Sequence, residues 1–178
     1  MINIPNLITC GRLLIANIGF ILMLTDHWKP AFLLILFSVL LDAMDGEVAR
    51  RLNQVSQTGI FLDIMADKIV IISTFLIVGY KLNPFFFYLG LLMLLREYVI
   101  DTLRAIAAAR KTVLSADALS KLKGVILMTA MVGAIGNHAF LGSAWIEGAM
   151  AAMGAIGMTL AYVTLGRFYL KCRDLQVF

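Results

Sequence analysis

Residues 40–51 read LLDAMDGEVARR, and they follow an apolar run that begins near residue 30. Asp42 and Asp45 lie three residues apart, so on a helix they share one face. An ionisable side chain in an apolar membrane helix is costly and marks a functional site by default. This stretch therefore indicates that the apolar part of a helix is followed by a polar functional site.

The composition of the whole chain agrees with a membrane location. Of the 178 residues 61% are hydrophobic, and mean hydropathy is +0.92. Charged residues make up 15%, against about 25% in soluble domains. The net charge of +4 suits basic loops beside anionic lipid, and no basic run interleaves with aromatic residues as in a nucleic-acid site. Cys10 and Cys172 are expected to be free thiols.

Six apolar stretches come near the length of about 20 residues that a membrane-spanning helix needs. The segment MINIPNLITCGR at the start is expected to form a short interfacial helix before the first of them. The predicted fold is an all-α membrane protein with six transmembrane helices, in one domain covering residues 1–178. The predicted spans are 7–25, 30–48, 58–80, 83–105, 121–141 and 144–167.

The distribution of Lys and Arg predicts the orientation. With both termini on one side, the opposite side holds only Lys29 and Lys81. The positive-inside rule then puts both termini and the second and fourth loops in the cytoplasm, for a multi-pass protein of the inner membrane. Arg12, Lys68 and Arg96 fall within or at the edges of spans, so each is expected to have a partner. The basic residues on the cytoplasmic side are Arg50, Arg51, Arg104, Arg110, Lys111, Lys121, Lys123, Arg167, Lys171 and Arg173.

A second pair of aspartates, Asp63 and Asp67, lies on one face of the next predicted helix. If the second and third spans form an antiparallel hairpin, Asp42, Asp45, Asp63 and Asp67 converge near the cytoplasmic surface. Carboxylates this close repel one another unless a cation compensates them. An all-oxygen set without His or Cys favours Mg²⁺ or Mn²⁺, one ion or two.

Residues around the aspartates suit a phosphate ligand. Gly46 and Gly59 leave room for close approach, and the planar fork of Arg50 can bind a diphosphate. Two plainer interpretations remain open: the glycines only let helices pack tightly, and Lys68 and Arg50 only neutralise two of the four aspartates.

The spacing of these residues resembles the signature of the CDP-alcohol phosphotransferase family. That resemblance implies a six-helix membrane fold, usually a homodimer, which transfers a substituted phosphate from a CDP-linked donor to an alcohol and releases CMP. It also implies that Asp42, Asp45 and Asp63 are metal ligands, and that Asp67 binds a second metal and acts as general base. The signature, in this numbering, is Asp42-x2-Asp45-Gly46-x2-Ala49-Arg50-x8-Gly59-x3-Asp63-x3-Asp67.

The resemblance further implies a CDP site lined by Gly46, Ala49, Arg50, Ser56 and Gly59. Two polar residues near the cytoplasmic surface at the start of the chain can also contact the nucleotide that the resemblance implies; the alternative is that they cap or anchor the first helix. These residues are Asn6 and Thr9.

Other segments are similar to the phosphatidylglycerophosphate synthase branch of the family: NIPNLIT, REYVIDTLR at 96–104 and SKLKG at 120–124. This branch uses CDP-diacylglycerol as donor and glycerol 3-phosphate as acceptor. Two segments depart from it, since FLDIMADK stands where FLDPLADK is common, and SKLKG where GKxKT is common.

The acceptor is a dianion, so its pocket needs fixed positive charge. The candidates for binding its phosphate are Arg104, Arg110, Lys121 and Lys123, all on the cytoplasmic side. Lys121 and Lys123 are two residues apart and cannot share a helix face, so one is expected in the cavity and the other at lipid headgroups. The alternative is that these residues only set topology.

Several other functions remain open. Within the family, inositol phosphate, serine or phosphatidylglycerol could be the acceptor. A membrane prenyltransferase also gathers aspartates around Mg²⁺, but it lacks the Gly-x2-Ala-Arg spacing. An ion or proton transporter would spread its acidic residues across the membrane, whereas here they gather toward one face.

Overall fold

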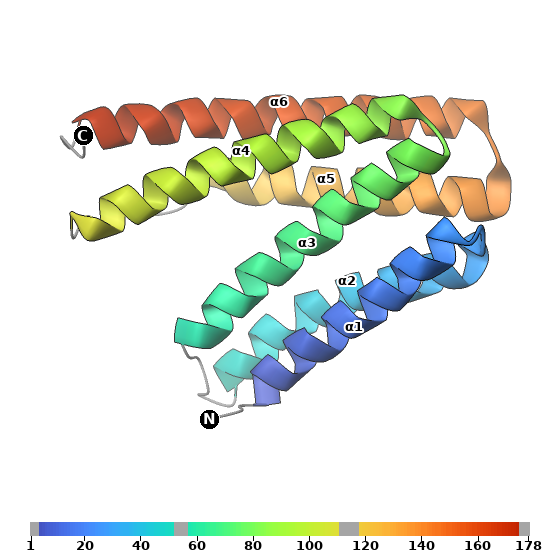
Figure 1. Cartoon of the computed structure of the whole chain (residues 1–178), viewed down its shortest axis with the longest axis horizontal. Helices are drawn as coiled ribbons and strands as arrows, with labels where there is room; N and C mark the ends of the chain where they lie inside the picture. Colours follow the sequence, from blue (N-terminus) through green and yellow to red (C-terminus); the bar gives the residue numbers. More distant parts are fainter. Residues whose placement is uncertain (1–3, 52–56, 111–117, 175–178) are drawn as a thin grey trace.

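The computed structural model describes residues 4–51, 57–110 and 118–174, without the side chains of residues 4–6, 43–51, 57, 58, 60, 118, 120 and 121. Helices joined by short turns make up this part of the chain, and it contains no strand (Figure 1). The helices are α1 (Ile4–Leu24), α2 (Trp28–Arg51), α3 (Gln57–Lys81), α4 (Pro84–Ala109), α5 (Ala118–Gly136), the π-helical turn η1 (Asn137–Leu141) and α6 (Ala144–Asp174).

Each predicted apolar stretch corresponds to one of these helices, with two extensions. Helix α4 continues through the alanine-rich end of its segment to Ala109, because alanine has the highest helix propensity. Helix α6 continues to Asp174, and Lys171 and Arg173 in its last turn complement the helix dipole. The sequence did not predict the π-helical turn that follows α5 and ends at Leu141, where Gly142 caps it with a φ of 61°.

The predicted separate interfacial helix at the N-terminus is wrong. Helix α1 runs unbroken from Ile4 to Leu24. Pro5 stands in its first turn, where a missing amide hydrogen costs nothing, and no proline follows within the helix. The described residues from Ile4 onward therefore extend the first predicted span along the same axis.

Three helices are apolar enough by themselves to cross a membrane: Leu7–Leu24, Leu122–Leu141 and Ala144–Asp174, with mean hydropathy of 2.0, 1.6 and 1.5 among the described residues. Helices α2, α3 and α4 have 24, 25 and 26 residues, or about 36–39 Å each. Those three are long enough to cross, but they carry the charged side chains of the site. The chain is thus an all-α membrane protein.

The helices pack mainly as α1 with α2, α3 with α4 and α5 with α6, and α1 also packs on α3 and α4 on α6. In Figure 1 the first turn of α1 and the last turn of α6 both lie away from the side on which the α1–α2, α3–α4 and α5–α6 connections gather. The simple hairpin predicted for the second and third spans is not the main packing, because α2 lies against α1 and α5 and α3 lies against α1, α4 and α5. The aspartates of α2 and α3 therefore meet beside α1.

An apolar core holds the middle of the bundle and fixes the helices that carry the site. Ala16 of α1, Ile35 of α2, Phe75 of α3 and Leu127 of α5 are all buried in one cluster. Close approach of backbones tightens this core where α3 meets α4.

At that contact, Gly79→Ala is expected to destabilise the protein by about 3 kcal/mol, the upper range for overpacking. A Cβ atom at Gly79 would overlap the backbone nitrogen and Cα of Phe87, which cannot move aside as a side chain end could. Thermal unfolding in detergent measures the change. Gly148→Ala in α6 is the control, since a Cβ there meets nothing within 4 Å; equal melting temperatures for the two variants would contradict the prediction.

Candidate active site

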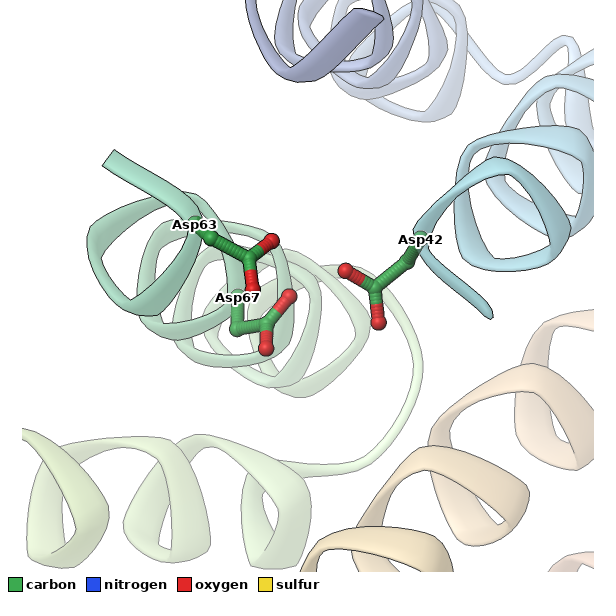
Figure 2. A group of neighbouring side chains, drawn as sticks. All are labelled: Asp42, Asp63 and Asp67. Carbon is green, nitrogen blue, oxygen red and sulfur yellow. The ribbon is translucent and has the colours of Figure 1, made fainter. Parts of the chain in front are cut away.

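Three aspartates from two helices come together at the centre of the site. Asp42 projects from α2 toward Asp63 and Asp67 on α3, and the carboxylates point at one another (Figure 2). One carboxylate oxygen from each lies within 4.8 Å of the others, and all three residues are half-buried. We call these residues the carboxylate triad. The side chain of Asp45, the fourth predicted ligand, lies outside the described part.

Arg12 of α1 is the counterion of the triad. Its Nη1 donates to Oδ1 of Asp42 and, at 2.8 Å, to Oδ1 of Asp67, while Nη2 donates to Oδ1 of Asp63 at 2.6 Å. The Arg12 side chain is only 2% exposed. Buried Ser38 of α2 donates to the backbone oxygen of Arg12 at 3.2 Å and fixes α1 against α2. The expectation that Arg12 has a partner is confirmed, although the sequence did not say which.

The plainer interpretation of Lys68, as a counterion of the aspartates, is wrong for the described residues. Lys68 follows Asp67 on α3 but turns to α4, where its Nζ donates to both carboxylate oxygens of Asp101 at 2.6 Å. Successive helix residues point about 100° apart, so one turn of α3 serves two separate networks. The side chain of Arg50 lies outside the described part.

The triad fits a divalent cation. With all three carboxylates ionised, the triad and Arg12 together carry a net charge of −2. Arg12 contacts Oδ1 of each carboxylate. Carboxylate oxygens are the ligands that Mg²⁺ and Mn²⁺ prefer. Asp42, Asp63 and Asp67 could therefore hold such an ion.

Two of the predicted nucleotide contacts lie near this centre. Thr9 is buried and precedes Arg12 by three residues on α1, so the two share a face. Gly59 is half-buried and precedes Asp63 by one turn on α3. The other predicted contacts lie outside the described residues or side chains: Asn6, Gly46, Ala49, Arg50 and Ser56.

A second charged cluster lies on the other side of α3, around Glu97 of α4. Oε1 of Glu97 accepts hydrogen bonds from Arg96 Nη1 and, at 3.3 Å, from Lys123 Nζ of α5. Lys68 Nζ lies 3.3 Å from the other carboxylate oxygen, Oε2. Arg104 Nη1 lies 3.9 Å from Asp101 Oδ1. We call these six residues the α4 charge network: Lys68, Arg96, Glu97, Asp101, Arg104 and Lys123.

The α4 charge network carries an excess of positive charge. Its four cations and two carboxylates leave a net charge of +2. Its inner end is buried at Arg96 and Glu97, which confirms the expectation that Arg96 has a partner. Its outer end is open, since the side chains of Asp101 and Arg104 are 41% and 46% exposed. An anion that enters from this end would find uncompensated positive charge.

The predicted acceptor residues divide between this network and the surface. Lys123 points into the bundle with 12% of its side chain exposed, and Arg104 lies at the open end, 5.9 Å from the centre of the Phe168 ring. Arg110 is exposed at the end of α4, where its backbone N–H donates to the oxygens of Ile106 and Ala107. The side chain of Lys121 lies outside the described part.

Sequence reasoning considered Lys68 only as a counterion of the aspartates and did not pair it with Glu97 or Asp101 of α4. The signal that could have found them is the presence of charged residues inside apolar helices, where each needs a partner. That signal marks the residues but does not pair them, because the partners are on different helices.

An apolar pocket of about 460 Å³ lies between α2, α5 and α6. Leu36 and Val39 line it from α2, and Val125 and Met128 line it from α5. Val39 lies three residues from Asp42, and Val125 two residues from Lys123. Val125 is 64% exposed, so the pocket opens at the outer surface of the bundle.

Comparison with known proteins gives a consistent match. A family model described as CDP-alcohol phosphatidyltransferase matches residues 2–166. A relative from Wigglesworthia glossinidia brevipalpis, named CDP-diacylglycerol–glycerol-3-phosphate 3-phosphatidyltransferase, is 32% identical over 98% of this chain and 97% of its own. A protein of the same name from Bacillus subtilis is 32% identical over 69% of this chain and 71% of its own. CDP-diacylglycerol–inositol 3-phosphatidyltransferase 1 from Arabidopsis thaliana is 37% identical over 51% of this chain and 40% of its own.

Proposed function

Because this chain belongs to the CDP-alcohol phosphatidyltransferase family, we propose that it transfers the phosphatidyl group from CDP-diacylglycerol to glycerol 3-phosphate. The products are phosphatidylglycerophosphate and CMP, in a step of phospholipid biosynthesis. The observation that supports glycerol 3-phosphate as the acceptor is the α4 charge network, which begins at Lys68, the residue after Asp67. Its excess of two positive charges matches a phosphate monoester, whose charge at pH 7 is about −2.

The donor binds at the triad. Asp42, Asp45 and Asp63 would hold a divalent ion, Mg²⁺ or Mn²⁺, and Asp67 would contribute to a second ion. Bound ions supply Lewis acidity that neutralises charge on the diphosphate. Arg50, Gly46, Ala49, Ser56 and Gly59 line the nucleotide site, with Asn6 and Thr9 at its edge. The acyl chains of the donor occupy the apolar pocket between α2 and α5, beside Val39.

The chemical step is an in-line displacement at the β-phosphorus of the donor. Asp67 accepts the proton of the acceptor hydroxyl, whose oxygen forms a bond to that phosphorus. The bond from the phosphorus to the bridging oxygen breaks, and its electron pair leaves with CMP. Arg104 and Lys123 bind the acceptor phosphate, so that the hydroxyl faces Asp67. Arg110 and Lys121 are further candidates for binding this phosphate.

The proposed topology has all six long helices crossing the inner membrane, with both termini and the active site cytoplasmic. The lengths of α2, α3 and α4 support this, because each exceeds the hydrocarbon thickness of about 30 Å. Pairing of their charges inside the bundle lowers the cost of placing them in the membrane. A homodimer is proposed on the resemblance to the family.

The acceptor is the part of this proposal most open to test, since one relative bears the name of an inositol transferase. Purified protein given CDP-diacylglycerol and Mg²⁺ or Mn²⁺ is expected to release CMP with glycerol 3-phosphate. The rates with serine, inositol or phosphatidylglycerol are expected to be at least about 100-fold lower, because their net charge of 0 or −1 compensates the positive network less than the phosphate dianion does. Inositol phosphate is the informative competitor, because it carries the same phosphate charge.

Two controls accompany this assay. A chelator is expected to abolish CMP release, and added Mg²⁺ or Mn²⁺ to restore it. Faster release with inositol phosphate or with an unphosphorylated alcohol would contradict the proposed acceptor. Ion flux into liposomes without CMP release would instead indicate the transporter alternative.

A further inference from the structure

Glu97 is the central carboxylate of the α4 charge network. It is 6% exposed, and its two oxygens meet basic groups from three helices: Lys68 of α3, Arg96 of α4 and Lys123 of α5. One negative charge therefore lies among three positive charges inside the bundle. Such an arrangement either clamps the helices together or holds a cation ready for a ligand.

Arg96 differs from the two lysines in how firmly it is held. Its Nε donates to the backbone oxygen of Ala161 at 3.1 Å and its Nη2 to Oγ1 of Thr164 at 2.9 Å, both on α6. Arg96 is thus anchored without Glu97, and its remaining donor fixes the Glu97 carboxylate. Contacts with α6 therefore hold Arg96 in place, and Arg96 in turn holds the Glu97 carboxylate.

Lys123 depends on Glu97 in the opposite way. Among the side chains that the structure describes, Glu97 is the carboxylate within ion-pair distance of Lys123 Nζ, at 3.3 Å. A lysine ammonium is a compact charge on a flexible stem, and it turns toward water when its inward partner is lost. Without the charge of Glu97, Lys123 would also face Lys68 and Arg96 as uncompensated like charges.

We propose that Glu97 is a positioning residue for the acceptor phosphate: it holds the Lys123 ammonium inside the bundle, where the phosphate binds. This inference rests on the proposed function. Glu97 itself does not touch the phosphate, since both are anionic. Its contribution is to keep the Lys123 ammonium inside the bundle. The phosphate enters at the end of the network where the side chains of Asp101 and Arg104 are exposed.

The test compares Glu97→Gln and Glu97→Asp with the wild-type protein. Glu97→Gln is expected to raise the KM for glycerol 3-phosphate about tenfold or more, as for loss of a hydrogen bond to a charged group. The KM for CDP-diacylglycerol and the kcat at saturating acceptor are expected to stay within about threefold, because the triad is untouched. Glu97→Asp keeps the charge and is expected to recover part of the acceptor affinity.

A binding measurement separates this role from a purely structural one. Calorimetric titration with glycerol 3-phosphate, without donor, is expected to give a Kd for Glu97→Gln that rises in parallel with KM. Glu147→Gln is the matched control, since that partly buried carboxylate accepts from Asn83 at 2.7 Å between the far ends of α4 and α6. It is expected to leave both constants unchanged.

Three outcomes would overturn the inference. An acceptor KM within twofold of wild type, or a lower one, would mean that Glu97 does not hold Lys123 for the phosphate. Equal rises in the KM of donor and acceptor, with a lower melting temperature, would make Glu97 a helix clamp alone. A wild-type protein that binds no glycerol 3-phosphate would overturn the proposed function as well, and the wild-type titration by itself identifies that case.

Discussion

Asp67→Asn is expected to lower the kcat of CMP release by about a thousandfold, within the range for loss of a general base. Asparagine has the shape of aspartate but cannot accept the proton of the acceptor hydroxyl. The triad retains Asp42 and Asp63, so the variant is expected to fold and to bind Mn²⁺. CMP release at saturating substrates gives kcat, and electron paramagnetic resonance of Mn²⁺ measures the bound ion.

The matched control for this substitution is Asp26→Asn. Asp26 lies in the turn between α1 and α2, its side chain is 67% exposed, and it pairs with Lys81 at 2.9 Å. Its φ of 63° is one that asparagine also adopts readily. Asp26→Asn is expected to keep wild-type activity. If Asp67→Asn stays within tenfold of the wild-type kcat, Asp67 is not the base.

Arg12→Ala is expected to produce the largest loss of stability among single substitutions in the site, about 3 kcal/mol. It removes the guanidinium that contacts Asp42, Asp63 and Asp67, and leaves three neighbouring carboxylates without that compensation. For a chain of this size the loss corresponds to a melting temperature lower by about 6–12 °C. Thermal unfolding in detergent measures it.

Two further measurements sharpen this prediction. Mn²⁺ is expected to raise the melting temperature of Arg12→Ala more than that of the wild type, because the ion then supplies all the compensating charge. Arg173→Ala is the control, since Arg173 is exposed and its pair with Asp174 at 3.6 Å contributes little. A melting temperature of Arg12→Ala equal to that of this control would contradict the counterion role of Arg12.

The local features of this protein could be predicted from the sequence. The apolar stretches predict the helices, and the helices observed begin and end within a few residues of most predictions. The spacing of Asp63 and Asp67 puts both on one face of α3, where the structure has them. These predictions succeed because helix periodicity and hydrophobicity are properties of a single segment.

Features that depend on two helices were predicted less well. Lys68 could have served the aspartates beside it or a residue elsewhere, and the structure pairs it with Asp101 and Glu97 of α4. The separate interfacial helix was wrong because nothing after Pro5 interrupts α1. The prediction that the second and third spans pack directly against each other did not include α1, which lies against both helices and carries Arg12.

The sequence by itself determined that this protein is a helical membrane protein with acidic residues gathered at one end of its spans. Only the tertiary structure decided which charges meet: Arg12 with the carboxylate triad, and Lys123 with Glu97. The physical reason is that periodicity sets which side chains share a face of one helix. Which face meets which neighbour depends on packing of the whole bundle, where each buried charge must find its partner on another helix.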